Sequence, residues 1–182
     1  DPNYAYITSY PSGSRPNVMR STNGVRGSFY GITGSGSGIG ADGANWVTPY
    51  LLDPQSPNIL YIGTTKAYRS IDHGSNWTQV GPGDMTGGSG TVLSLDINPN
   101  FTEVLLAGTT SGRVWYTTNS GDDWDDITAG LPSRSINDVA SDPTNPNRAF
   151  AVVGGFNTEH LWEWNAGSGW TDHFIGDVPA NA

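Results

Sequence analysis

The sequence is poor in several residue types, and each shortage bears on what the protein can be. It has no cysteine, which excludes a disulfide framework and a thiolate metal site. Lysine and arginine total 8 against 17 aspartate and glutamate, giving a net charge of −9. Phosphate binding needs clustered basic side chains, so we expect no nucleic acid partner. No apolar run approaches the length of a membrane span, and we expect none.

The abundant residues favour short strands joined by turns. Glycine occurs 25 times and proline 12 times, in a chain of 182 residues that is long enough to bury one sizeable core. Only 35% of the residues are hydrophobic, but seven tryptophans and eight tyrosines provide large side chains for packing.

A short motif recurs four times, and its period sets the fold class. The clearest copy is Ser70-Ile71-Asp72-His73-Gly74-Ser75-Asn76-Trp77. Further copies lie at 117–124 and 163–170, and a distorted one opens the chain at 21–29. The closing aromatic residues, Phe29, Trp77, Trp124 and Trp170, are 48, 47 and 46 residues apart. A fixed period of this size indicates an array of one supersecondary unit.

The residue types of the motif predict a rigid turn. The Asp or Asn side chain accepts hydrogen bonds from following backbone amides, the glycine allows a tight backbone, and the aromatic ring pins the turn to a neighbouring layer. We therefore expect structural roles, not catalytic ones, for Ser70, Asp72, Gly74, Trp77, Thr117, Asn119, Gly121, Trp124, Asn165, Gly167 and Trp170.

The pattern Ser-x-Asp-x-Gly-x-x-Trp resembles the Asp-box, or bacterial neuraminidase repeat. A second motif precedes two of the copies, as Asp-Pro-x-x-Pro-Asn at 53–58 and as Asp-Pro-x-Asn-Pro-Asn at 142–147. Together they resemble secreted bacterial "glycosyl hydrolase, BNR repeat" proteins and, more distantly, xyloglucanases and sortilin-type propellers. The resemblance implies a β-propeller of four-stranded antiparallel blades in a secreted or cell-surface protein of bacterial origin.

We predict an all-β chain forming one segment, 1–182, with repeats at 1–37, 43–82, 89–132 and 134–176. Each repeat should contain strands A to D, except that the first lacks strand A. The predicted strands are 4–9, 17–20 and 28–33; 47–52, 59–64, 67–70 and 78–80; 91–97, 104–109, 114–117 and 125–127; and 136–141, 148–154, 160–164 and 171–174. Residues 176–182 resemble a linker to a next strand A. We expect about four blades of a larger ring or array, with a homo-oligomer or a closed four-bladed ring as alternatives.

An antiparallel meander separates its loops onto two faces. The repeated turns (C–D) and the Asp-Pro turns (A–B) share one face, and the B–C and D–A loops share the other, which we call the entrance face. Functional residues are expected there. The ligand-binding candidates are Tyr10, Arg15, Arg113 and Phe156, and the catalytic candidates are Asp42, Asp84 and Glu159. Trp46 also lies there, although its place before a strand A suits a core anchor.

The catalytic set is sparse. Only three glutamates occur, Glu103, Glu159 and Glu163, and the Arg-Ile-Pro signature of sialidases is absent. Glycoside hydrolysis needs two carboxyl groups across a cleft. The leading hypothesis is therefore a non-catalytic scaffold or interaction module that binds glycan or protein. The alternatives are a xyloglucanase- or sialidase-like glycoside hydrolase whose active site is incomplete in this chain, and a self-assembling extracellular structural protein.

We expect no metal and no cofactor. The three histidines, His73, His160 and His173, fall in separate repeats. The glycine-rich run at 34–43 lacks the Lys-Ser/Thr ending of a phosphate-binding loop and is interpreted as a connection between blades.

Overall fold

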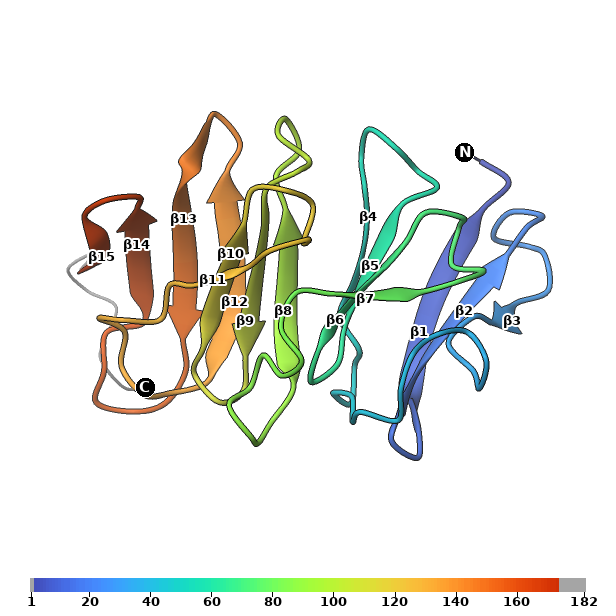
Figure 1. Cartoon of the computed structure of the whole chain (residues 1–182), viewed down its shortest axis with the longest axis horizontal. Coiled ribbons are helices and arrows are strands. Elements are labelled where there is room, and N and C mark those ends of the chain that lie inside the picture. Colours follow the sequence, from blue (N-terminus) through green and yellow to red (C-terminus); the bar gives the residue numbers. More distant parts are fainter. Residues whose placement is uncertain (1, 174–182) are drawn as a thin grey trace.

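The computed structural model describes residues 2–173 of the chain and contains strands and turns (Figure 1). Among those residues, no helix is long and apolar enough to cross a membrane. The strands are β1 (Ala5–Ser12), β2 (Arg15–Ser21), β3 (Tyr30–Gly31), β4 (Tyr50–Leu52), β5 (Leu60–Gly63), β6 (Ala67–Ser70), β7 (Thr78–Val80), β8 (Val92–Ile97), β9 (Leu105–Thr109), β10 (Val114–Thr117), β11 (Asp125–Asp126), β12 (Ile136–Asp142), β13 (Asn145–Val153), β14 (Leu161–Asn165) and β15 (Gly169–Asp172).

The strands form four separate antiparallel sheets in chain order. The first sheet has three strands, β1-β2-β3, and the other three have four each, β4 to β7, β8 to β11 and β12 to β15. Each is a meander in which consecutive strands are neighbours, so the predicted all-β blade architecture is confirmed. The first and fourth sheets lie at opposite ends of the molecule, and the described sheets form an open series (Figure 1).

Three strands have the bounds that the sequence predicted. Strands β6, β7 and β10 coincide with the predicted 67–70, 78–80 and 114–117. The largest differences lie at chain reversals. Strand β4 begins after Pro49, which has no backbone N–H to donate to a neighbouring strand. The β1–β2 hairpin extends to a Ser12–Arg15 pair, so the predicted B–C loop at 10–15 is a tight turn. The predicted linker at 176–182 lies outside the described residues.

The core lies between the sheets. Buried side chains form three clusters, one in each gap between successive sheets. Val18, Leu60 and Trp77 fill the first gap, Met85, Val92 and Trp115 the second, and Leu106, Ile136 and Trp164 the third. The stability of the array therefore depends on burying each sheet against the next.

One sequence position repeatedly joins neighbouring sheets by hydrogen bonds. It is the residue just before the Ser or Thr of the repeated turn. Arg20 donates to the His73 carbonyl of the second sheet at 2.7 Å, and Arg69 donates to the Ser120 carbonyl of the third at 2.9 Å. Tyr116 donates to the Pro146 carbonyl of the fourth at 2.9 Å. The first two bonds satisfy carbonyls in turns of the following sheet, and the third satisfies one near the start of β13.

The glycine-rich segment at 34–43 packs along the second sheet. The Ser37 carbonyl accepts from the Trp77 amide at 2.8 Å. Gly38 has φ of +101°, and a Cβ there would lie 2.0 Å from the Trp77 carbonyl oxygen. Gly36, two residues earlier, also has positive φ, +91°, but a Cβ would meet nothing within 4 Å.

These two glycines give a matched test of this packing. Gly36→Ala should destabilise the protein by about 1 kcal/mol, because alanine disfavours positive φ. Gly38→Ala should cost about 1–3 kcal/mol more, because the methyl group must displace backbone. Urea unfolding of both variants measures the difference. Equal losses would contradict this packing of the loop.

Candidate functional site

The two clear copies of the repeated turn are held by nearly the same hydrogen bonds. Ser70 Oγ donates to Asp72 Oδ1 at 2.8 Å and accepts from the Gly74 amide at 2.8 Å. Asp72 Oδ1 also accepts from the Asn76 amide at 2.9 Å. In the next copy, Thr117 Oγ1 donates to Asn119 Oδ1 at 2.8 Å, and Asn119 Oδ1 accepts from the Asp123 amide at 2.9 Å. His73 and Ser120 both have φ of 60° at the same point of the turn.

The other two copies are built differently. Asn165 pairs with Gly169 across a short hairpin, and its side-chain amide donates to Glu163 Oε1 at 3.0 Å. Gly167 keeps a positive φ, and Trp170 still donates to the Ile127 carbonyl of the preceding sheet. In the opening copy the Asn23 amide bonds Ser21 Oγ at 3.2 Å. The fourth sheet thus keeps the aromatic anchor and uses a tighter turn.

The repeated turns lie beside the A–B turns of their own sheets. The His73 amide donates to the Asn58 carbonyl at 2.9 Å, and the Ser120 amide to the Glu103 carbonyl at 2.9 Å. Asp53 Oδ1 caps its A–B turn by accepting from the Gln55 and Ser56 amides. Burial opposes ionisation of Asp72, but hydrogen bonds from Asn76 and Ser70 outweigh it and lower the pKa of that carboxyl. The carboxylates of Asp53 and Asp72 thus accept hydrogen bonds from backbone amides of their own turns.

On the entrance face, Asp42 is enclosed by side chains of the second sheet. Lys66 Nζ lies 3.0 Å from Asp42 Oδ1, and the Tyr68 hydroxyl donates to Asp42 Oδ2. The same hydroxyl accepts from the Gly40 amide at 3.2 Å. Burial and the carboxylate together raise the pKa of Tyr68, and the hydrogen bond to Asp42 raises that of Lys66. Asp42 therefore ties loop 34–46 to the sheet.

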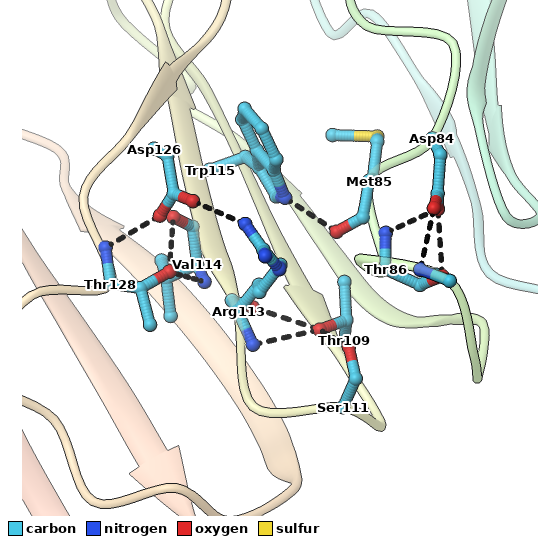
Figure 2. A network of polar contacts seen from close by, with 11 residues as sticks. Asp84, Met85, Thr86, Thr109, Ser111, Arg113, Val114, Trp115, Asp126 and Thr128 are labelled. Carbon is cyan, nitrogen blue, oxygen red and sulfur yellow. Dashed lines mark hydrogen bonds and ion pairs between the residues drawn. The ribbon is translucent and has the colours of Figure 1, made fainter.

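Asp84 caps its own loop (Figure 2). Its Oδ1 accepts from the amide and the hydroxyl of Thr86, both at 2.7 Å, and its Oδ2 accepts from the Gly88 amide at 2.6 Å. The hydrogen bonds from Thr86 lower the pKa of Asp84, and the bond from the Gly88 amide lowers it further by a smaller amount. Trp115 completes the arrangement by donating its indole N–H to the Met85 carbonyl at 2.7 Å. This carboxylate is a loop anchor that stays ionised.

A pocket of about 580 Å³ lies on the entrance face between Arg113 and loop 128–133. Arg113 Nη1 and Asp126 Oδ2 form an ion pair of 2.7 Å in its wall, which Figure 2 shows beside Thr128. Ser111, Thr128 and Ser133 add hydroxyl groups, and Leu131 and Pro132 add apolar surface. An ion pair surrounded by hydroxyls offers both donors and acceptors to a polar ligand. Asp126 is not among the residues predicted from the sequence. It pairs with Trp115 in the ladder of β10 and β11, and its side chain reaches Arg113, two residues before Trp115.

The remaining candidates are dispersed. Arg15 donates to the Ile39 carbonyl and so holds loop 34–46. Phe156 is 68% exposed at the tip of the β13–β14 connection. The Glu159 carbonyl accepts from Trp162 Nε1 at 3.0 Å, close to the start of β14. Asp42 lies in the connection from the first sheet to the second, Asp84 in the connection from the second to the third, and Glu159 in the β13–β14 connection of the fourth sheet, so the three candidates belong to separate loops.

Tyr10 and Trp46 form an exposed aromatic pair. Their ring centres are 5.7 Å apart with planes inclined by 21°, and the exposed fractions are 64% and 74%. The interpretation of Trp46 as a core anchor is wrong, because Pro49 delays strand β4 and leaves Trp46 in the preceding loop.

Within residues 2–173, no three His, Asp or Glu side chains gather in a group that could hold a metal ion. His73 stacks on Tyr4 with ring centres 3.9 Å apart, and His173 lies 3.0 Å from Glu163. His73 thus contacts the segment before β1, whereas His173 contacts a residue of its own sheet.

Comparison with known structures shows the fold. An ancestral GH74 enzyme matches with a TM-score of 0.66 and 20% identity, over 96% of this chain and 27% of that one. The GH74 xyloglucanase from Xanthomonas campestris matches with a TM-score of 0.66 and 18% identity, over 94% of this chain and 29% of that one. YCF48 bound to a D1 peptide matches with a TM-score of 0.55 and 16% identity, over 93% and 52%.

These likenesses show that the chain folds as blades of a β-propeller. The chain spans about a quarter to a half of the length of these three proteins. No protein-family model matches the sequence, and no curated protein matches it either.

The hydrogen bonds to Asp84 predict an acid-sensitive loop. Its folded pKa lies below the ordinary value of 3.8, so its contribution to stability is complete above that value and is lost as the pH falls through the folded pKa. Unfolding midpoints in urea, measured between about pH 6 and pH 2, should therefore fall less steeply for Asp84→Asn than for the native protein. Parallel pH profiles would show that this carboxylate does not stabilise the fold.

Proposed function

We propose that this chain is a non-catalytic propeller module of the Asp-box type, from a secreted or cell-surface bacterial protein, that binds glycan or protein through its entrance face. The observation that carries the proposal is the engagement of the two loop aspartates. Asp42 is enclosed by Lys66 and Tyr68, and Asp84 accepts three bonds within its own loop. A general acid must instead present its carboxyl group to a substrate.

The chemistry of the entrance face supports binding. The pocket at Arg113 offers an ion pair and several hydroxyl groups, which suit a polar ligand with its own donors and acceptors. Opposite it, the face with the repeated turns uses its polar side chains to cap turns and join sheets. The face with the repeated turns thus serves the fold, and the entrance face is the one available for binding, as expected where loops carry function on a rigid frame.

The comparisons support the same reading in outline. One structural relative is described with a bound peptide, and another is a xyloglucanase. Protein and glycan are therefore the two ligand classes to test first for this chain.

A glycoside hydrolase is the second candidate, favoured by the likeness to GH74 structures. In this chain, Glu159 is the catalytic candidate whose carboxylate is least engaged, because its described bonds involve the backbone carbonyl. A hydrolase would need a second carboxyl group within about 5–10 Å of it across a cleft, contributed by another blade.

Long incubation of the purified protein with xyloglucan and with a sialoside tests for hydrolysis. We expect no release of reducing sugar or sialic acid above a heat-inactivated control. Turnover that disappears in Glu159→Gln would refute the non-catalytic proposal.

A glycan array and a peptide array test for binding. Arg113→Met should reduce the signal on whichever array responds by about tenfold, because it removes the pocket's charged donor. The substitution should change the free energy of unfolding by less than about 1 kcal/mol, since exposed ion pairs contribute little to stability. Arg148→Met is the matched control, because Arg148 is similarly exposed but pairs with Asp142 and Glu163 away from the pocket.

A further inference from the structure

Trp46 differs from the other tryptophans of the chain. Trp77, Trp115 and Trp164 are buried, and Trp124, Trp162 and Trp170 are half-buried against the sheets. Trp46 alone among the seven is classed as exposed, with 74% of its surface accessible. A large apolar ring exposed to water beside a second exposed ring marks an interaction site.

The aromatic pair is held by the loops on both sides. Tyr10 extends from β1 at the edge of the tight turn that pairs Ser12 with Arg15. The Gly43 amide donates to the Ser14 carbonyl at 2.9 Å, which fastens the loop of Trp46 to that turn. Asp42, bound to Lys66 and Tyr68, fixes the same loop to the second sheet.

The pair is therefore preorganised. Near-parallel rings whose centres are 5.7 Å apart must be offset, so they present a stepped platform. Because the platform is already ordered, a ligand that stacks on it does not have to immobilise either loop, which lowers the entropic cost of binding.

We propose that Tyr10 and Trp46 are a stacking platform for neutral β-linked pyranose sugars, at the junction of the first and second sheets. This rests on the proposed binding function of the entrance face and names its ligand class. The C–H faces of a β-linked glucose or xylose ring are flat and apolar, and its hydroxyls lie at the rim, where loop polar groups can meet them.

Other ring-bearing ligands fit less well. The net charge of −9 repels nucleotides and anionic sugars. An extended peptide gains most of its affinity from a sheet edge or from pockets for its side chains, whereas the platform consists of two exposed rings on loops. A neutral pyranose needs only the ring face and solvent-exposed hydrogen-bonding groups.

The single exposed tryptophan allows a direct test. Acrylamide quenching and N-bromosuccinimide oxidation should report mainly Trp46, because the other indoles are at least half-buried. Cellohexaose or xylohexaose should protect Trp46 from both reagents, and oligogalacturonate should not. Trp46→Ala should remove the quenchable component, and Tyr10→Ala should weaken protection by about tenfold. Tyr30→Ala is the control, because Tyr30 is 70% exposed but lies in β3, outside the platform.

The outcomes separate the platform from the wider proposal. Protection that is lost in Tyr10→Ala and kept in Tyr30→Ala supports the platform. If neither neutral hexaose protects Trp46, the platform is refuted. If Arg113→Met then still reduces array binding by about tenfold, the entrance face keeps its binding role at the pocket beside Arg113. Hydrolysis of the hexaoses that depends on Glu159 would instead refute the non-catalytic function itself.

Discussion

The insertion of a tryptophan ring from the repeated turns of the second, third and fourth sheets, each into the gap before its own sheet, holds the array together. Trp77 is buried and donates its indole N–H to the Ile32 carbonyl at 2.9 Å, and Trp170 donates to the Ile127 carbonyl. Both acceptors lie in the outer part of the preceding sheet. Each ring thus buries apolar area and satisfies a carbonyl at once, and the sheets cannot separate without exposing both.

Trp124 shows which of these two contributions matters more. Its ring occupies the corresponding gap and lies so close to Gly81 that a Cβ there would be 2.1 Å from Cδ1. Yet within the described residues its buried indole nitrogen has no acceptor. An unpaired buried donor costs about 1–3 kcal/mol, so the packing of the ring must outweigh that loss at this junction. The area buried by the ring, more than its hydrogen bond, keeps the sheets together.

Much of the frame was predictable from the sequence. The period of the turns indicated an array of one repeated unit, and the resemblance to the Asp-box implied that the unit is an antiparallel blade. The residue types of the two clear copies predicted the bonds of Asp72 and Asn119, because those bonds are local. The turn at Asn165 was not predictable in the same way, since the length of the hairpin between β14 and β15 decides whether its side chain faces the turn. The exposure of Trp46 was missed because β4 starts at Tyr50, three residues later than the predicted strand. Site residues were hardest to predict because loop contacts such as Lys66 with Asp42 join segments that carry no shared pattern.

The difference between the loops of the entrance face follows from one strand position. Tyr68 and Trp115, each the second residue of its strand C, reach across to the preceding D–A loop and bind Asp42 and the Met85 carbonyl. In the fourth sheet the corresponding residue, Trp162, donates instead to its own Glu159 carbonyl. Loop 128–133 therefore lacks that tether, and the pocket beside Arg113 lies along it. A repeated frame thus generates distinct loop surfaces by changing the partner of one side chain, while the sheets that carry the loops remain alike.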